Sequence, residues 1–362
     1  MKVLIIGGGV GGLAAARALR KDDHDVSVFE QAPALRTDGA AVTLWSNGTG
    51  ILSALAVPVE GAHIDVLEQH DHDGKLLASV DVKNTAAHYG HPNICLPRAR
   101  LLERLADGIP IQFNKACTRV IQTSTGPRVE FADGSTAQGD ILVGADGRGS
   151  VVRDQLWGKD PAEPTGWATW QGVREIDTEI TGSRRGAMFV GPAGTCGLMP
   201  AGDGLLQWWF DQRWTPGKQS PRPQDSFKTW TAAPVREVLA TITDEETGFF
   251  PHYRHRVPRV WGEGWITLLG DAAHSMPPTR AQGANQALED AWLLRPAINQ
   301  NSVQALRHYE RTRSAKAGRV AREAGREDIN RYHPWLVKMI PDALTARYYT
   351  RWIGQISDYL TS

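Results

Sequence analysis

Residues 1–30 read MKVLIIGGGVGGLAAARALRKDDHDVSVFE, and this stretch decides the fold. The apolar run 3–6 predicts a buried strand, and the glycines of 7–12 predict a tight turn after it. Residues 13–21 then carry a helical pattern, and 26–29 predict a second strand that ends at Glu30. A strand, a helix and a second strand in this order indicate an α/β fold built on a parallel sheet.

The spacing of the glycines indicates what this turn binds. Gly7 allows the turn after the strand, Gly9 lets the backbone approach a pyrophosphate, and Gly12 lets the helix pack closely on the strand. The helix N-terminus offers free N–H groups to phosphates, and Glu30 is placed to accept hydrogen bonds from ribose hydroxyls. Glycines also serve turns that bind nothing, but the strand, helix and acid together favour a dinucleotide that contains adenosine diphosphate.

Composition excludes several other classes of protein. The chain has 362 residues, 41% of them hydrophobic, with 40 basic and 40 acidic side chains, so it lacks the basic excess typical of nucleic-acid binding.

Residues 1–19 resemble a secretory signal in part, but they are too rich in glycine, and no eighteen-residue apolar run predicts a membrane span. Three cysteines without zinc spacing favour a reducing, cytoplasmic location. The 37 glycines and 13 tryptophans exceed average usage.

Two later segments separate FAD from NAD as the bound dinucleotide. Residues 141–153 read ILVGADGRGSVVR, and residues 265–291 read WITLLGDAAHSMPPTRAQGANQALEDA. With the N-terminal glycine turn, these segments resemble the three fingerprints of the single-component FAD-dependent aromatic hydroxylases, and they occur in the same order. This family includes the para-hydroxybenzoate, salicylate and urate hydroxylases and the tetracycline-modifying monooxygenases. A fourth segment, LPRARLLERL at 96–105, resembles the family's cofactor-contacting helix.

The resemblance implies a Rossmann-like FAD-binding domain of the GR2 type with a parallel sheet, an inserted antiparallel-sheet substrate domain and C-terminal helices. We expect the FAD domain at 1–62, 96–160 and 261–300, the substrate domain at 63–95 and 161–260, and the helices at 301–362. It also implies bound FAD, transient NADPH or NADH, and O2. A C4a-hydroperoxide of the flavin would then hydroxylate an aromatic or polycyclic small molecule. No second glycine fingerprint for a nicotinamide domain occurs in the sequence.

The family motifs assign roles to individual residues of this chain. Asp271 would accept a hydrogen bond from a ribityl or ribose hydroxyl, and a helix starting near Gly283 would direct its amides at the flavin pyrimidine. Pro277 and Pro278 would line the flavin face where oxygen reacts. The cofactor-binding residues implied by the resemblance are Gly7, Gly9, Gly12, Glu30, Arg36, Gly39, Arg98, Asp146, Asp271, Pro278, Gly283, Ala284 and Asn285.

One position departs from the family. Ala281 stands where relatives usually carry glycine, and we expect a negative φ there so that alanine fits. Arg280 before it is a candidate for binding a substrate carboxylate or phenolate, and an outward orientation into solvent is the alternative. The sequence names no base that would activate a substrate hydroxyl, so Arg280 and Gln207 are the only catalytic candidates.

Strand-like runs rich in tryptophan separate the cofactor segments, at 62–95 and 165–260. We expect the two insertions to join as one antiparallel sheet over the flavin. Alternation along 205–210 puts Gln207 and Trp209 on one face, predicted to line the pocket, and Trp208 and Phe210 on the other. Thr195, Met199 and Pro277 are further candidates for substrate contact. Tryptophans that simply fill the core are the alternative.

Other chemistries lack support in the sequence. His252 and His255 form an HxxH in a strand-like stretch, which does not place both rings on one face, so we predict no metal site. There is no GxSxG elbow for hydrolysis. The Arg-rich stretch 303–330 is interpreted as a solvated helix face. A flavin-dependent halogenase, whose WxWxIP segment is absent, an isoprenoid reductase and a non-catalytic FAD-binding regulator remain alternatives.

Overall fold

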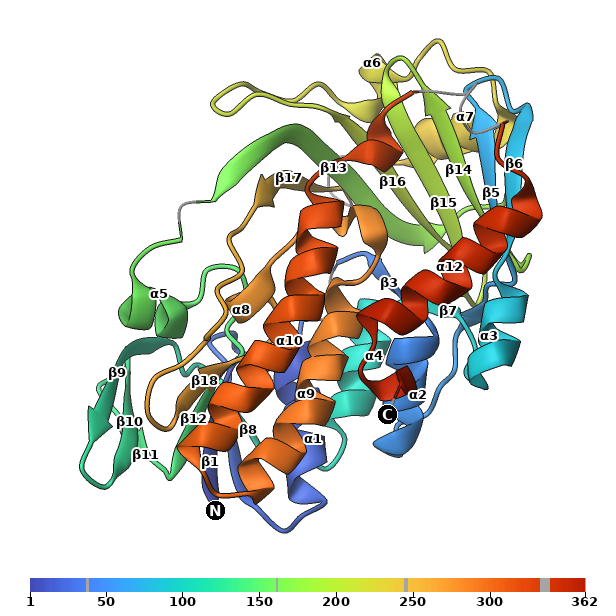
Figure 1. Cartoon of the computed structure of the whole chain (residues 1–362). Coiled ribbons are helices and arrows are strands. Elements are labelled where there is room, and N and C mark those ends of the chain that lie inside the picture. The colour runs from blue at the N-terminus through green and yellow to red at the C-terminus, as the bar shows by residue number, and fades with distance from the viewer. Residues whose placement is uncertain (37–38, 161, 244–246, 333–338, 362) are drawn as a thin grey trace.

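The computed structural model describes residues 1–36, 39–160, 162–243, 247–332 and 339–361. Its lower half in Figure 1 is built on a five-stranded parallel sheet, with the strand order β18-β12-β1-β2-β8. The strands of this sheet are β1 (Lys2–Ile6), β2 (Asp25–Phe29), β8 (Ile111–Gln112), β12 (Ile141–Gly144) and β18 (Ile266–Leu268). The predicted parallel α/β fold is therefore confirmed. Strands β12 and β18 are buried throughout, whereas the edge strand β8 is partly exposed.

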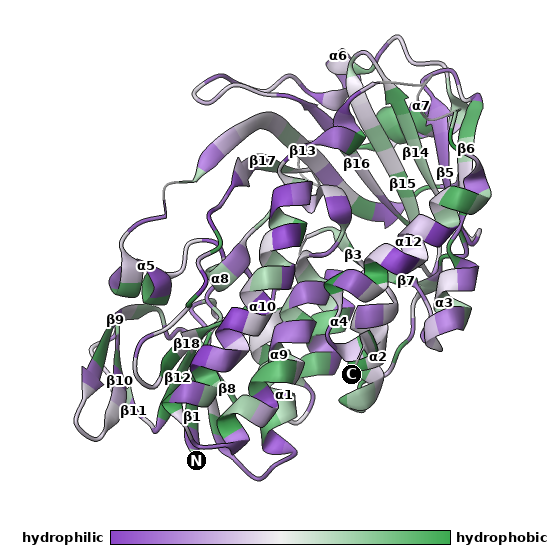
Figure 2. Cartoon of the chain, in the orientation of Figure 1, coloured by the Kyte–Doolittle hydropathy of each residue, from purple (hydrophilic) through white to green (hydrophobic). Residues whose placement is uncertain are grey.

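Two helices pack on this sheet from widely separated parts of the chain. Helix α1 (Val10–Arg20) follows the glycine turn and contacts α9 (Gly283–Asn299) along its length. Small side chains in α1, including Ala14, Ala15 and Ala18, are fully buried and let the helices approach closely. Helix α10 (Val303–Ala324) lies antiparallel beside α9 (Figure 1). Figure 2 shows that the residues of α10 are largely hydrophilic, whereas those of α9 are mixed.

Smaller elements complete this half of the molecule. The helices are α2 (Ser46–Ala54), α4 (Arg98–Ala106), α5 (Val151–Trp157) and α8 (Asp271–His274). A three-stranded sheet joins β3 (Ala41–Leu44), β7 (Ile94–Pro97) and β4 (Ala62–His63). A hairpin sheet at the far left of Figure 1 contains β9 (Cys117–Thr123), β10 (Gly126–Phe131) and β11 (Thr136–Gln138).

The two insertions form one seven-stranded sheet in the upper half of Figure 1, with the order β17-β13-β16-β15-β14-β5-β6. The strands are β5 (Val66–Asp71), β6 (Leu76–Asp81), β13 (Glu163–Glu175), β14 (Arg185–Gly191), β15 (Gly194–Gly202), β16 (Leu205–Arg213) and β17 (Gly248–Arg254). The junction between the insertions, β14 with β5, is parallel, and all other pairs are antiparallel. The prediction that both insertions share a sheet is confirmed, and its uniformly antiparallel pairing is corrected at this one junction.

The remaining helices are α3 (Lys83–Tyr89), α6 (Pro223–Ser226), α7 (Ala233–Thr241) and α12 (Asp342–Ile356), with single turns η1 (Pro278–Arg280), η2 (Asp328–Asn330) and η3 (Tyr359–Thr361). Pro341 is the N-cap residue of α12, and Pro334 lies outside the described residues. None of the helices in the described ranges is long and apolar enough to cross a membrane.

The interpretation of α10 as a solvated charged helix is partly wrong. Arg311 and Arg322 are exposed, but Arg313 and Glu310 are fully buried. Glu310 accepts hydrogen bonds from the Trp261 backbone and from Thr267, so its charge serves the contact with the parallel sheet. Charged residues of α10 such as Glu310 and Arg313 are therefore buried where other segments of the chain supply hydrogen-bond partners for them.

Candidate active site

Four sequence-predicted residues meet at the carboxyl edge of the parallel sheet. Gly7 follows β1, Glu30 follows β2, Asp146 follows β12, and Asp271 opens α8 after β18. The four strands are neighbours and parallel, so these residues lie along one edge although they are far apart in the chain. Open α/β sheets bind their ligands at this edge.

The glycine turn has the geometry that its spacing predicts. Gly7 has φ of 111°, and a Cβ there would lie 2.3 Å from the Ala145 carbonyl oxygen. A Cβ on Gly12 would lie 2.0 Å from the Gly7 carbonyl oxygen, so both positions require glycine. At Gly9, by contrast, a Cβ would meet no atom within 4 Å. Space therefore opens in front of the α1 N-terminus, which suits a phosphate group.

Glu30 lies beside the glycine turn with its carboxylate held by the backbone. It accepts hydrogen bonds from the Gly8 amide at 2.7 Å and from the Ala32 amide at 2.9 Å. These contacts fix the carboxylate at the end of β2, next to the open space at Gly9. The arrangement fits the ribose-binding role that the sequence predicts for this acid.

Asp146 serves the turn that contains it. Its Oδ1 accepts from the Ser150 hydroxyl at 2.5 Å, and its Oδ2 accepts from the Val151 amide at 2.8 Å. Ser150 in turn caps α5 by accepting from the Arg153 amide at 3.0 Å. Burial raises the pKa of Asp146, and these hydrogen bonds oppose the rise. The aspartate thus stabilises the Asp146–Gly147 turn, and direct contact with a cofactor stays a prediction.

Three polar side chains project without partners beside this edge. Asp271, Arg98 and Arg36 are exposed, and none of them makes a side-chain hydrogen bond within the described part of the chain. Arg98 is the first residue of α4, as the family pattern implies, and Gly39 adopts φ of 120°. A carboxylate and two guanidinium groups are therefore available for a ligand that carries hydroxyl and phosphate groups.

A buried ion network, which the sequence did not predict, holds the Gly270–Asp271 turn. Asp290 of α9 accepts from the Gly270 amide at 2.8 Å and hydrogen-bonds His274 at 2.5 Å. Its other oxygen accepts from Arg313 Nε at 2.7 Å, and all three side chains are fully buried. Although burial alone would raise the pKa of Asp290, His274 and Arg313 hold it below its usual value. His274 thus acts through Asp290 to position the turn.

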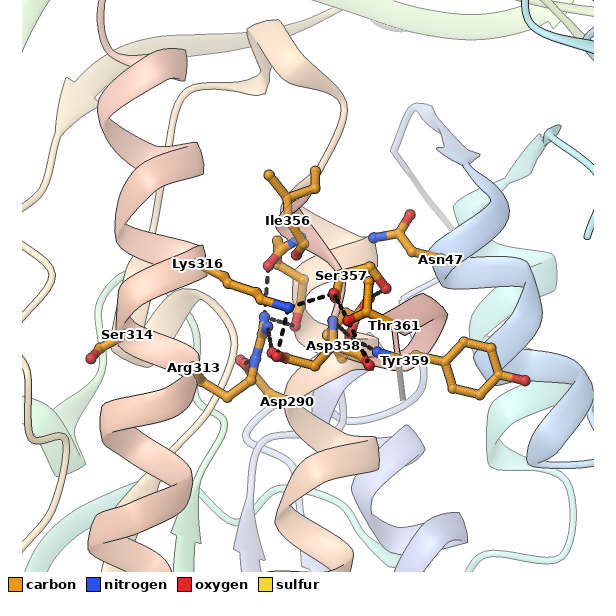
Figure 3. A network of polar contacts seen from close by, with 12 residues as sticks. Asn47, Asp290, Arg313, Ser314, Lys316, Ile356, Ser357, Asp358, Tyr359 and Thr361 are labelled. Atoms are coloured by element: carbon orange, nitrogen blue, oxygen red, sulfur yellow. Dashed lines mark hydrogen bonds and ion pairs between the residues drawn. The ribbon is translucent and has the colours of Figure 1, made fainter. Parts of the chain in front are cut away.

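Figure 3 shows how the same network reaches the C-terminal segment. Arg313 also donates to Asp358 at 2.8 Å, and Lys316 pairs with Asp358 at 2.7 Å. Glu289 of α9 accepts from the Ser357 hydroxyl and from the Asp358 amide. The segment after α12 is therefore fixed on α9 and α10.

Helix α9 begins at Gly283, as predicted, shortly after η1. A Cβ on Gly283 would meet no atom within 4 Å, so the helix begins at open space. Asn285, predicted to contact the cofactor, uses its side chain on the protein itself. Its amide donates to the Thr43 and Ala281 carbonyls, and its oxygen accepts from the Trp45 amide at 3.0 Å. Asn285 therefore fixes the start of α9 to β3 and α2.

The expectation of a negative φ at Ala281 is wrong. Ala281 has φ of 47° and ψ of 38°, because its amide donates to the Pro278 carbonyl at 2.7 Å and closes the η1 turn. Alanine is strained in this left-handed conformation. Arg280 is half-buried, and its Nε has no hydrogen-bond partner among the described residues.

The predicted alternation along β16 is confirmed. Trp208 and Phe210 are fully buried in the cluster under α6 and α7. Gln207 and Trp209 lie on the opposite face, where Gln207 pairs with Met199 and Trp209 pairs with Gly197. This face packs toward β7 and α12, because Met199, Trp209 and Tyr349 share a cluster with Cys95. Thr195 lies on the same face, opposite Asp211.

The loop that holds Pro277 and Pro278 contacts α10. Pro277 is buried and Pro278 is exposed at the start of η1. The neighbouring Thr279 hydroxyl donates to the Ala324 carbonyl at 3.0 Å.

His252 and His255 contact separate carboxylates, Glu327 and Asp160, and no metal-binding group of side chains occurs within the described ranges.

Together these features define a candidate nucleotide-binding site. They are a glycine turn at a helix N-terminus, an acid at the end of β2, an exposed aspartate after the last strand, and a helix that begins at open space. Residues 1–324 match the family described as "FAD binding domain". The chain is 31% identical over 330 residues to the FAD-dependent urate hydroxylase of Klebsiella oxytoca, covering 86% of each chain. It is 30% identical over 361 residues to the 6-hydroxynicotinate 3-monooxygenase of Bordetella bronchiseptica, covering 89% of this chain and 90% of the relative.

Solved structures show the same likeness. Klebsiella pneumoniae HpxO complexed with FAD and uric acid superimposes with a TM-score of 0.91 at 26% identity, covering 98% of this chain and 97% of HpxO. The chain therefore belongs to the FAD-binding-domain family of flavin-dependent aromatic hydroxylases. It is an FAD-dependent monooxygenase that uses NAD(P)H and O2, and the halogenase, reductase and regulator alternatives are set aside.

Proposed function

We propose that the substrate is a flat, oxygenated aromatic or heteroaromatic ring that lies against β15 and β16. The observation that carries this proposal is the Trp209 indole. It lies across Gly197 on the neighbouring strand, so closely that a Cβ on Gly197 would be 1.9 Å from Trp209 Cζ2. Glycine thus admits an indole flat against the sheet, and a flat indole offers a stacking surface for another ring.

The polar groups around Trp209 are mostly hydrogen-bond donors. Gln207 Oε1 accepts from the Cys95 thiol at 3.4 Å, which turns the Gln207 amide nitrogen away from Cys95. The Thr195 hydroxyl, the Tyr349 hydroxyl and the Trp45 indole nitrogen are buried without a hydrogen-bond partner within the described residues. Tyr349 packs with Trp209 in one cluster and lies 5.6 Å from the Trp45 ring. Buried donors favour a ligand that brings acceptors, such as carbonyl, phenolate or ring-nitrogen atoms.

The names of the relatives support a ring of this kind. The urate hydroxylase of Klebsiella and the 6-hydroxynicotinate monooxygenase of Bordetella act on oxygenated heterocycles. We propose that this chain takes the same chemical class, with Gln207, Trp209, Thr195, Met199 and Pro277 in contact with it. Arg280, whose Nε has no hydrogen-bond partner among the described residues, is proposed to bind a substrate carboxylate or phenolate.

The residues at the sheet edge are proposed to hold FAD. Gly7, Gly9 and Gly12 would receive the pyrophosphate, Glu30 the adenosine ribose, and the remaining contacts would come from Arg36, Gly39, Arg98, Asp146, Asp271, Pro278, Gly283, Ala284 and Asn285. When bound, FAD takes a hydride from NAD(P)H and activates O2 for transfer to the ring. This chain's residues orient the ring, exclude water from it and hold the cofactor.

Domain boundaries and location are proposed on the same basis. We propose an FAD domain at 1–62, 96–160 and 261–300, a substrate domain at 63–95 and 161–260, and C-terminal helices from 301. All three cysteines are thiols, and Cys95 and Cys196 are buried. This supports a reducing compartment such as the cytoplasm as the place of action.

The test uses FAD-loaded protein with uric acid, 6-hydroxynicotinate and salicylate. We expect NAD(P)H oxidation to increase with at least one oxygenated heterocycle, and the product to contain one atom from ¹⁸O2. Gln207→Leu should raise KM about tenfold or more, because it leaves a substrate acceptor unpaired. Gln138→Leu, an exposed change on β11, should leave KM unchanged. Equal KM values for both variants would contradict the proposed pocket.

A further inference from the structure

Tyr349 on α12 buries a hydroxyl group that no described residue receives. The ring keeps some accessible surface, but its oxygen is buried and has no hydrogen-bond partner among the described residues. Two other tyrosines show the usual arrangement: the Tyr309 hydroxyl donates to the Leu268 carbonyl at 3.3 Å, and the Tyr89 hydroxyl donates to the Thr350 carbonyl at 2.9 Å. A buried tyrosine hydroxyl normally finds such a partner, because leaving the bond unmade costs stability. Tyr349 is an exception that calls for an explanation.

The Tyr349 ring lies where the substrate face meets the cofactor half of the molecule. It packs in the cluster that holds Met199 and Trp209, two of the residues proposed to contact the substrate. It also packs in the cluster that holds Trp45 and Met276, which directly precedes the loop with the two prolines. Helix α12 contacts both β6 of the upper sheet and α2 of the lower half (Figure 1). The C-terminal helix therefore supplies a side wall to the proposed pocket.

Trp45 adds a second unpartnered donor beside Tyr349. Its side chain is 5% exposed, and the indole Nε1 has no hydrogen-bond partner in the described ranges. The two rings meet edge to face, with centroids 5.6 Å apart and planes at 75°. The Trp45 backbone is fixed, since its amide donates to Asn285 Oδ1 at 3.0 Å and its carbonyl accepts from the Thr49 amide at 3.0 Å. Trp45 thus links the start of α9, proposed to lie at the flavin, with the Tyr349 ring.

Both groups are suited to binding and not to removing a proton. Burial raises the pKa of Tyr349 well above its usual range, because an ionised phenolate would lose its hydration there. The Tyr349 hydroxyl therefore keeps its proton, and the Trp45 indole N–H can only donate. A hydroxyl that holds its proton cannot take another from a substrate as a base. The pair can instead orient a ring by donating hydrogen bonds to it.

Trp208 shows that an unpartnered donor alone does not mark a site. Its indole nitrogen also lacks a partner among the described residues, but Trp208 is fully buried in the cluster under α6 and α7, on the opposite face of β16. Tyr349 differs in two respects. Its ring keeps accessible surface, and it packs with residues already proposed to contact the substrate. These two observations select Tyr349 as the donor that faces a ligand.

We propose that Tyr349, with Trp45 beside it, is a specificity-determining residue that donates a hydrogen bond to an oxygen or nitrogen acceptor of the substrate ring. This proposal rests on the proposed function. The ring would lie between Trp209 of the sheet and Tyr349 of the C-terminal helix. A ring without an acceptor on that side would leave both donors unpaired, so the pocket selects against hydrocarbon rings of the same shape.

The test applies the same substitution to two adjacent tyrosines of α12. Tyr349→Phe removes the buried hydroxyl and keeps the ring, whereas Tyr348→Phe removes a hydroxyl from a side chain that is 66% exposed. The ligands are uric acid, 6-hydroxynicotinate and salicylate, titrated into FAD-loaded protein without NAD(P)H and followed by flavin fluorescence. For the ligand that the wild type binds most tightly, Tyr349→Phe should raise the Kd about tenfold. Tyr348→Phe should leave that Kd unchanged.

Thermal unfolding of the FAD-loaded protein without substrate gives a readout besides binding. Because the Tyr349 hydroxyl has no partner among the described residues, Tyr349→Phe should keep the Tm or raise it by about 1–2 °C. A lower Tm would mean that the hydroxyl already bonds within the protein, and the proposal would fall.

The binding outcomes separate this role from the pocket itself. An equal Kd for the wild type and Tyr349→Phe would overturn the role of Tyr349 and leave the pocket intact. A wild type that binds none of the three ligands would instead overturn the proposed pocket and, with it, the role of Tyr349.

Discussion

Replacing Arg313 by Met tests whether the buried network carries both stability and the shape of the FAD site. The change keeps most of the side-chain volume but removes hydrogen bonds to Asp290, Asp358 and Gln286. Asp290 would keep His274 and Asp358 would keep Lys316, but both carboxylates and the neighbouring Glu289 would lose the guanidinium that lies between them. Breaking a buried ion pair from one side costs about 3–5 kcal/mol. This is a large part of the roughly 5–15 kcal/mol that stabilises most proteins.

The measurement is urea unfolding of the FAD-free protein, followed by circular dichroism, with FAD affinity measured separately by fluorescence. Arg311→Met on the same helix is the control, because Arg311 is exposed and should change stability by less than about 0.5 kcal/mol. Arg313→Met should also weaken FAD binding, since Asp290 holds the Gly270 amide and His274. A loss below about 1 kcal/mol, with FAD affinity unchanged, would refute this reasoning.

Three further outcomes follow from the described geometry. Gly9→Ala should fold normally but bind FAD weakly, whereas Gly12→Ala should lose folded protein, because its Cβ would meet a carbonyl oxygen at 2.0 Å; soluble yield and flavin content distinguish them. Ala281→Gly should raise the free energy of unfolding by about 0.5–1 kcal/mol by removing the left-handed strain, and an unchanged value would contradict it. The Arg295 hydrogen bond lowers the pKa of Asp22 from 3.8 to about 2. The stability lost in Asp22→Asn should thus be constant above pH 3.8 and shrink as the pH falls toward 2, measured by unfolding at each pH.

The cofactor edge could be predicted because its signals are local. Each strand ends in a motif of a few residues, and parallel strands bring their ends to one edge whatever the length of chain between them. The alternation along β16 was equally local, since side chains of neighbouring residues point to opposite faces. Gln207 and Trp209 were therefore separated from Trp208 and Phe210 from six residues of sequence, and their contact with a substrate stays a prediction.

The buried networks could not be predicted in the same way. In the sequence, Arg313 stands among charged residues, as a solvent-exposed helix residue would. It is buried because α9 and the segment after α12 pack against it. Asp211, His252 and Glu327, joined through Thr169 in a second buried network, come from three segments that no short motif connects. One signal was present: Asp211 has the same parity in β16 as Gln207 and Trp209, which placed a carboxylate on the inward face. The strain at Ala281 was missed because a turn's handedness depends on how η1 closes.

The contact between Arg313 and Asp358 has a consequence for the order in which the protein folds. The two residues are separated by 45 positions, so a chain emerging from the ribosome presents the complete α9–α10 pair before Asp358 exists. Until then the guanidinium must stay hydrated or keep the helices apart. The FAD site, whose Gly270 turn depends on the same aspartate, would thus mature only when the segment after α12 closes over both helices.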